Sequence, residues 1–271
     1  MYTEERKTRA AAWFSSIQTT IIELLESFED TAHFTRKAWN RPGGGGGTMA
    51  LLKGNVFEKA GVNVSTVFGE FSKEFQSSIP GAQENPSFWA SGISIVIHPR
   101  SPHVPIIHMN TRMIVTQKGW FGGGIDLTPC IPVDTDTKDF HHALKTTCDE
   151  FDKTYYPTFK AEADTYFYLP HRNEPRGVGG IFYDNVSSGN WEADFAFTQA
   201  VGKTFGQIYG ELVKRNLHTP WGESEREKQL IKRSRYVEFN LIYDRGTQFG
   251  LKTNGNAEAI LMSLPPLVAW D

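Results

Sequence analysis

Apolar side chains recur every three or four positions near the start of the chain. The stripe that they form is Phe14, Ile17, Ile21, Leu24 or Leu25, and Phe28. This spacing is typical of an amphipathic helix, and Thr3 stands where a side chain can cap the first turn. We therefore predict a helix from Glu4 to Phe28 that buries its apolar stripe.

Glycines interrupt this pattern soon afterwards. Five of them, Gly43–Gly47, directly follow Pro42, and ordering so many glycines costs a large amount of backbone entropy. We expect a mobile loop at this point. A phosphate-binding loop is the alternative, although neither GK[ST] nor GxGxxG spacing follows the run.

Between residues 54 and 126 the period of the pattern changes to two. Short stretches rich in β-branched and aromatic residues alternate with Gly, Pro and Ser: VNVSTVF, ISIVIH, PIIHMNTRMIVT and WFGGGIDL. Such segments predict strands of an antiparallel sheet that are joined by short loops.

The second half of the chain returns to helical spacing. One stripe runs from Phe140 to Tyr155 and ends near Pro157, a longer one runs from Trp191 to Leu217, and a charged stretch follows. The last segments are expected to be a strand over 235–243, a turn over 244–246 and a strand over 247–252. Because the strands form two groups with helices between them, we predict one α+β domain over residues 1–271, a sheet covered by helices.

Composition narrows the function. The 271 residues have a formal net charge of −3, with the basic residues spread along the chain, so the basic footprint that binds nucleic acid is missing. Cys130 and Cys148 are too few for a disulfide framework and lack CxxC spacing, which fits a reducing compartment. No signal sequence is recognised, and no apolar run approaches the roughly 20 residues of a membrane span. We expect a cytoplasmic protein.

One predicted strand carries its chemistry on a single face. In PIIHMNTRMIVT, period two places His108, Asn110 and Arg112 together in a row of about 13 Å. The preceding strand places Ser94 and His98 on one face, and a hairpin would turn both rows toward the same cleft. A solvated sheet face is the alternative, although such faces usually carry Lys, Glu and Thr.

Three further segments carry candidate groups. Asp126 ends WFGGGID, where three glycines either let a flat ligand approach the backbone or form a bulge without a ligand. The segment YLPHRNEPRGVGG is either a charged surface turn or an anion clamp. Its charged side chains are His171, Arg172, Glu174 and Arg176. Near the C-terminus the chain presents Asp244, Arg245 and Lys252.

Four histidines in separate predicted elements could converge on a divalent metal ion. They are His98, His108, His141 and His171. No HExxH or HxH spacing fixes two of them locally as ligands, so the pattern alone leaves both a metal site and separate roles open.

Taken in order, the motifs resemble the oxygen-dependent coproporphyrinogen oxidase family. They are GGGGGTMALLKGNVFEKAGVNVS, SGISIVIHP, HMNTRMI, WFGGGIDLTP, YLPHRNEPRGVGGIFYD, AVGK, YVEFNLIYDRGTQFGL and AEAILMSLPP. The resemblance implies a flat antiparallel sheet between helices, a substrate cleft over one sheet face and a homodimer with contacts from about Tyr236 onward. The implied reaction decarboxylates two propionates of coproporphyrinogen III to vinyl groups, which gives protoporphyrinogen IX in haem synthesis.

The resemblance also implies roles for particular residues. Those matching substrate contacts are Ser94, Asn110, Thr111, Arg112, Asp244, Arg245 and the turn Asn254, Gly255 and Asn256. His108 matches a proton donor, while Arg112 and Asp126 match positions implicated in catalysis. The metal positions of bacterial members match His98, His108, His141 and His171. Relatives are expected to carry an arginine in place of Asn256, so one carboxylate clamp is either missing or replaced, with Lys252 as the candidate.

The substrate's chemistry suggests a mechanism. Guanidinium groups bind carboxylates in bidentate fashion, so Arg112, Arg245 and Arg172 are candidate anchors. Asp126 is the candidate to hold the pyrrole N–H protons, and His108 is a candidate acid or base near neutral pH. Oxygen would react directly with the electron-rich ring, so O2 is expected as co-substrate without a required cofactor. Two rivals stay open, a non-catalytic tetrapyrrole-binding protein and a metal-dependent hydrolase that uses the four histidines.

Overall fold

A seven-stranded antiparallel sheet forms the centre of the molecule. The computed structural model describes residues 3–77, 79–252 and 255–271. The strands lie in the order β1-β2-β3-β4-β5-β6-β9. Their bounds are β1 Thr35–Asn40, β2 Gly45–Leu52, β3 Phe57–Glu70, β4 Ser87–Pro99, β5 Ile106–Val115, β6 Gly119–Thr128 and β9 Gly180–Val186. A separate two-stranded ribbon pairs β7 Tyr168–Leu169 with β8 Glu174–Pro175.

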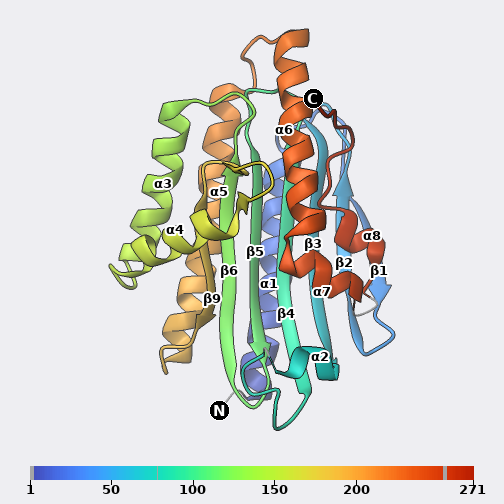
Figure 1. The fold of residues 1–271 in the computed structure, drawn as a ribbon, viewed down its shortest axis with the longest axis vertical. Helices are drawn as coiled ribbons and strands as arrows, with labels where there is room; N and C mark the ends of the chain where they lie inside the picture. Colours follow the sequence, from blue (N-terminus) through green and yellow to red (C-terminus); the bar gives the residue numbers. More distant parts are fainter. Residues whose placement is uncertain (1–2, 78, 253–254) are drawn as a thin grey trace.

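Helices lie on both faces of this sheet, as Figure 1 shows, with α1 and α5 behind the strands and α6 in front. Their bounds are α1 Glu4–Glu26, α2 Lys73–Gln76, α3 Asp134–Asp149, α4 Tyr155–Tyr166, α5 Trp191–Asn216, α6 Glu223–Ile242, α7 Arg245–Lys252 and α8 Ala257–Leu261. The α+β architecture predicted from the sequence is confirmed. Among the helices of the described chain, none combines the length and the apolar character that crossing a membrane takes.

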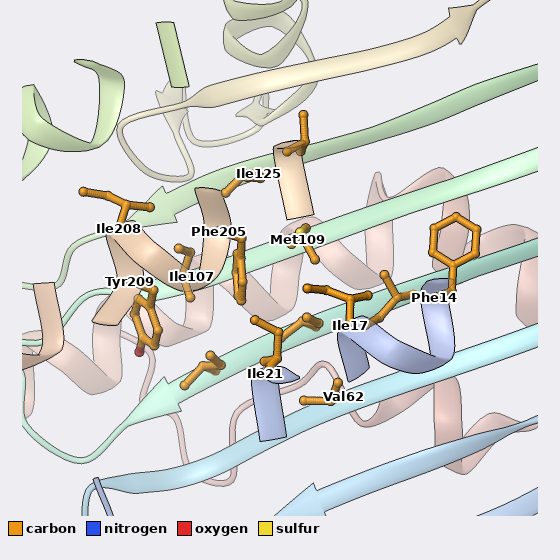
Figure 2. Packing of buried hydrophobic residues seen from close by; sticks show 14 of the residues in the cluster. Phe14, Ile17, Ile21, Val62, Ile107, Met109, Ile125, Phe205, Ile208 and Tyr209 are labelled. Carbon is orange, nitrogen blue, oxygen red and sulfur yellow. The ribbon is translucent and has the colours of Figure 1, made fainter. Parts of the chain in front are cut away.

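The main hydrophobic core lies between the sheet and the helices α1 and α5 (Figure 2). The labelled side chains are Phe14, Ile17 and Ile21 of α1, Phe205, Ile208 and Tyr209 of α5, and Val62, Ile107, Met109 and Ile125 of the strands. Burying one such side chain contributes about 1.5–3 kcal/mol. We call the sheet face that packs here the inner face, and the face that α6 crosses the outer face.

The predicted N-terminal helix and the predicted first group of strands are confirmed. The backbone N–H of Arg6 donates to Thr3 Oγ1 at 3.3 Å, so Thr3 caps α1 as expected. The long helix expected from Trp191 is α5. The stripe from Phe140 to Tyr155 is divided, because the chain turns after α3 and resumes as α4, with Pro157 in the first turn, where a missing N–H costs little.

The expectation of a loop at Gly43–Gly47 is wrong for its second half. Strand β2 begins at Gly45 and pairs with β1 and β3, so its backbone groups are satisfied on both sides. Gly44 and Gly45 turn the chain with φ angles of 114° and 79°. A Cβ atom on Gly47 would lie 2.7 Å from the ring of Trp39. These glycines therefore serve a tight turn and a close contact rather than mobility.

The strands expected over 235–243 and 247–252 are also wrong, because the chain forms α6 and α7 there. The Glu225 carboxylate accepts from the N–H of Gly222 at the start of α6, and the following residues are strong helix formers. Within α6, Gln229, Arg233 and Tyr236 are buried at helical spacing. Packing against the outer face thus overrides the β-propensity of the segment YVEF.

Replacing Phe205 with Ala tests the inner core. Phe205 is 1% exposed in the main cluster, so the cavity is expected to lower the free energy of unfolding by about 3–5 kcal/mol. Urea denaturation measures the change. Phe151→Ala is the control, because Phe151 is 37% exposed and its truncation should cost less than half as much. Equal losses for both variants would contradict this assignment of the core.

Candidate functional site

The predicted polar rows meet on the outer face. In the β4–β5 hairpin, Ser94 lies opposite Asn110. In the neighbouring β5–β6 pair, His108 lies opposite Asp126. Because residues in register share a face, the hairpin and its shared polar face, which the sequence predicted, are confirmed.

Glycines form the floor between these polar groups. Arg112 lies between Gly92 of β4 and Gly122 of β6, and Asn110 faces Gly124. A Cβ atom at Gly122 would lie 3.1 Å from Arg112 Nη2 and 3.3 Å from Asp184 Oδ1. The missing side chains leave this part of the sheet flat and let the guanidinium lie against the backbone. Such a floor suits a flat ligand.

His108, Asp126 and Arg176 form a hydrogen-bonded triad. His108 Nδ1 lies 2.8 Å from Asp126 Oδ1, and Asp126 Oδ2 accepts from Arg176 Nη2 at 2.6 Å. The His108 side chain is 18% exposed, while those of Asp126 and Arg176 are each 2% exposed. His108 is therefore the member of the triad that a ligand on the outer face can reach.

Aromatic rings enclose the guanidinium of Arg176. Its Cζ lies 4.5 Å from the ring centroid of Phe167, 4.4 Å from that of Tyr236 and 4.5 Å from that of Phe239. Its Nη1 donates to Asn240 Oδ1 at 3.0 Å. The sequence predicted a surface turn or an anion clamp for this segment, and for Arg176 both are wrong, because its guanidinium is buried and holds Asp126.

Asp126 is an ionised group inside the protein. Burial alone would raise the pKa of its carboxyl, but Arg176 and the hydrogen bond from His108 outweigh burial and lower the pKa. Both carboxylate oxygens are already engaged, and the side chain is buried. The expected direct grip of Asp126 on pyrrole N–H groups therefore does not fit this geometry. What the structure shows is that Asp126 holds the His108 ring through Oδ1.

A second charged group lies at the β9 side of the outer face. Asp184 Oδ1 pairs with Arg112 Nη2, and Asp184 Oδ2 lies 3.3 Å from Arg245 Nη2. Arg112 Nη1 also donates to Asn110 Oδ1 at 3.0 Å. Two of the expected carboxylate anchors, Arg112 and Arg245, are thus brought together. The third, Arg172, is paired with Glu238 instead.

A hollow opens beside this group. Its volume is about 590 Å³. Its walls are Thr158, Ala161, Glu162, Thr165 and Tyr166 of α4, Phe182 and Asp184 of β9, and Arg245 of α7. Asp184 and Arg245 therefore border the hollow, whereas Arg112 and His108 are not among its lining residues.

Two of the predicted contact residues make contacts within the fold. The Thr111 side chain is fully buried on the inner face, with its Oγ1 3.4 Å from Tyr183 Oη, so it is not placed to contact a ligand on the outer face. Asp244 accepts from Tyr166 Oη at 2.8 Å and from the N–H of Thr247 at 2.7 Å. It therefore fixes the start of α7.

The predicted turn near the C-terminus is only partly described. Asn256 Oδ1 accepts from the N–H of Ala259 at 3.0 Å and caps α8, while the N–H of Gly255 donates to the Gly250 carbonyl. The predicted role of Asn254 lies outside the described residues. Lys252 lies 3.9 Å from Glu74 in an exposed pair, so its ion-pair partner among the described residues is not part of the Arg112–Asp184–Arg245 group.

The four histidines do not converge within the chain. Each ring has its own partner: the Ser263 carbonyl for His98, Asp126 for His108, the Val178 carbonyl for His141 and Glu238 for His171. Among the described residues, no group of three or more His, Cys, Asp or Glu side chains is placed to hold a metal ion. The residues therefore do not fit the metal site that the resemblance implied, and no chemical step is assigned to a metal.

Comparison with known proteins places the chain in a family. A model of the coproporphyrinogen III oxidase family matches residues 9–271. The chain belongs to this family. It is 55% identical over 269 residues to the oxygen-dependent coproporphyrinogen-III oxidase of Rickettsia bellii, which covers 96% of each chain. It is 54% identical over 276 residues to that of Rickettsia rickettsii, over 98% of this chain and 99% of the relative.

Sequence reasoning missed Asp184 altogether and missed the buried role of Arg176, which it had named only as part of a charged segment. Asp184 follows Phe182 by two positions on β9, so period two in the segment GIFYDNV could have placed both on the outer face. The buried role of Arg176 left no such signal, because its partner Asp126 lies 50 positions away in the sequence.

Replacing Arg176 with Met tests the buried ion pair. The change leaves Asp126 without its cation in a buried position, so the free energy of unfolding should fall by about 3–5 kcal/mol. Arg172→Met removes an arginine whose side chain is 32% exposed, and should cost about 1 kcal/mol or less. Chemical denaturation of both variants makes the comparison. Similar small losses would contradict the central position given to Arg176.

His98 predicts a pH dependence of stability. Burial lowers the pKa of His98 to about 3 in the folded chain, despite its hydrogen bond to the Ser263 carbonyl. An unfolded histidine titrates near pH 6.5. Between these two pH values the unfolded chain takes up a proton at His98 and the folded chain does not. The free energy of unfolding is therefore highest above about pH 6.5 and falls as the pH drops toward 3, by up to about 1.4 kcal/mol per pH unit.

Denaturation of wild type and His98→Gln between pH 7 and pH 4 measures this dependence. The variant should lose less stability per pH unit than the wild type, because the glutamine cannot take up the proton. His218→Gln, at an exposed position, is the control and should follow the wild-type curve. Parallel curves for wild type and His98→Gln would refute the prediction.

Proposed function

We propose that this chain is an oxygen-dependent coproporphyrinogen III oxidase that binds its substrate on the outer face of the sheet. It removes two carboxyl groups by oxidative decarboxylation and converts the propionates to vinyl groups, which gives protoporphyrinogen IX for haem synthesis. The relatives named above support the activity. The outer face supports the location of the site.

One observation carries this location. A flat floor of glycines lies between paired guanidinium groups at one end and a partly exposed imidazole at the other. Arg112 and Arg245 provide bidentate binding for carboxylates, and the floor accommodates a planar ring system. A tetrapyrrole with carboxylate side chains matches both features, and Ser94 and Asn110 border the same floor.

The reaction balances without a further reductant. In each turn the bond to the carboxylate breaks and its electron pair forms the vinyl double bond, which releases carbon dioxide. The adjacent carbon loses a hydrogen with its electron pair, and dioxygen takes up this hydride equivalent with a proton as hydrogen peroxide. His108, with Nδ1 held by Asp126, is the group placed to move a proton at Nε2.

Dioxygen is proposed as co-substrate, and no resident cofactor is invoked. The reduced pyrrole ring is electron-rich and is itself the electron donor, so the residues have to bind and orient the substrate and move protons. The separate engagement of the four histidines supports this choice over a metal-dependent hydrolase. Turnover by chelator-treated protein with its metal content measured tests it, and a loss of activity restored by metal would overturn it.

A homodimer and a cytoplasmic location are further parts of the proposal. Large apolar side chains are exposed on the C-terminal segment, namely Leu241, Ile242, Leu251, Leu267 and Trp270. This supports dimer contacts from about Tyr236 onward, and sedimentation of the purified chain tests them. The thiols of Cys130 and Cys148 are free and buried, which is compatible with a reducing compartment.

The decisive assay starts with coproporphyrinogen III and the purified chain under anaerobic conditions. Admission of oxygen should start oxygen uptake coupled to carbon dioxide release, and the product should be detected as porphyrin fluorescence after oxidation. Binding without carbon dioxide release would instead identify a non-catalytic tetrapyrrole-binding protein.

His108→Ala tests the proton-transfer role in the same assay. The variant is expected to lose about 10²- to 10⁴-fold in kcat, which is the usual contribution of a positioned acid or base. Its affinity for coproporphyrin III, the stable oxidised analogue of the substrate, should change little, because Arg112 and Arg245 remain. His218→Ala at an exposed position should keep wild-type kcat. Wild-type turnover by His108→Ala would remove His108 from the mechanism.

A further inference from the structure

Asp184 occupies the two arginines that the proposed substrate needs. Its two carboxylate oxygens face different guanidinium groups, Oδ1 that of Arg112 and Oδ2 that of Arg245. A carboxylate on this spot makes the same contacts that a substrate propionate would make. The free chain therefore carries its own carboxylate in the place of a ligand carboxylate.

Each arginine has other contacts that hold it in place. Arg112 Nη1 donates to Asn110, and its guanidinium lies against the backbone at Gly122. The Cζ of Arg245 lies 4.9 Å from the ring centroid of Tyr166 and 5.4 Å from that of Phe182. Because hydrogen bonding and cation–π contact already orient the two groups, Asp184 is not required to position them.

Solvent exposure makes the Asp184 contacts exchangeable. The side chains of Arg112, Asp184 and Arg245 are 27%, 32% and 62% exposed, and the hollow borders Asp184 and Arg245. Ion pairs at such positions contribute little net free energy, so another carboxylate can compete for the guanidinium groups. The buried Asp126–Arg176 pair has no such access.

We infer that Asp184 is a tethered competitor, which occupies the Arg112–Arg245 pair in the free chain and is displaced by a carboxylate of the substrate. The inference rests on the proposed function and assigns a specificity-determining role to a residue of β9. A substrate with several carboxylates can displace Asp184. After a carboxylate has been lost as carbon dioxide, Asp184 pairs again with Arg112 and Arg245. This favours release or repositioning of the ring.

Removing the charge of Asp184 should therefore tighten binding. The probe is coproporphyrin III, the stable oxidised analogue with the same carboxylates, and its Kd is measured by fluorescence titration at low and at high salt. Asp184→Asn and Asp184→Ser are expected to lower Kd by roughly three- to tenfold at low salt. The gain should shrink as salt screens the exposed charges.

Asp164→Asn is the matched control. It also removes one negative charge near the β9 side, but Asp164 pairs with Lys160 on α4 instead of with the two arginines. The control should keep the wild-type Kd, so a gain confined to the Asp184 variants separates competition from a general charge effect. Circular dichroism and thermal unfolding show whether each variant is folded.

Three other outcomes of the titration would contradict the competitor role of Asp184 or the proposed function. Unchanged or weaker binding by both folded Asp184 variants, with wild type binding normally, would overturn the competitor role and identify Asp184 as a residue that positions the arginines. An equal gain in Asp164→Asn would overturn it as well. If the wild type fails to bind coproporphyrin III, the proposed function itself fails, which distinguishes the two failures.

Discussion

The ion pair between Asp126 and Arg176 is the interaction on which the outer face depends. It joins β6 to the segment after β8, and Asn240 ties the same guanidinium to α6. Two unpaired charges in this position would be very costly, so each residue needs the other. The pair also orients His108 through its Nδ1. One buried contact thus links the attachment of α6 to the placement of the His108 ring.

The outer face combines a demand for openness with a demand for stability. Glycines at positions 92, 122 and 124 leave the floor flat but weaken the strands that contain them. The inner face compensates, because β4 and β6, the strands that contain these glycines, bury Ile93 and Ile125 in the main core with α1 and α5. On the outer face, hydrophobic packing lies beside the glycine floor rather than on it: Tyr236 of α6 packs with Val96 and Ile106.

Local pattern predicted what local pattern decides. Period two placed Ser94, Asn110 and Arg112 on one face, because alternation is a property of the strand itself. It could not identify α6, since the segment YVEF favours a strand and becomes helical through contacts with distant groups. Gln229 and Arg233, for example, both donate to the Pro99 carbonyl. The ion pair of Asp126 with Arg176 could not be predicted either, because it also joins residues that are distant in the sequence.

Burial decides what each carboxylate–arginine pair of the site can do. Asp126 and Arg176 are both 2% exposed, so neither can exchange its partner, and the pair serves as a fixed support. Asp184 has the same chemistry, but its side chain is 32% exposed beside a hollow. Solvent reaches it, and exposed ion pairs of this kind contribute little net free energy. In the proposed site the two pairs have different tasks, because the fixed one holds the imidazole while the exchangeable one leaves the arginines accessible to a substrate carboxylate.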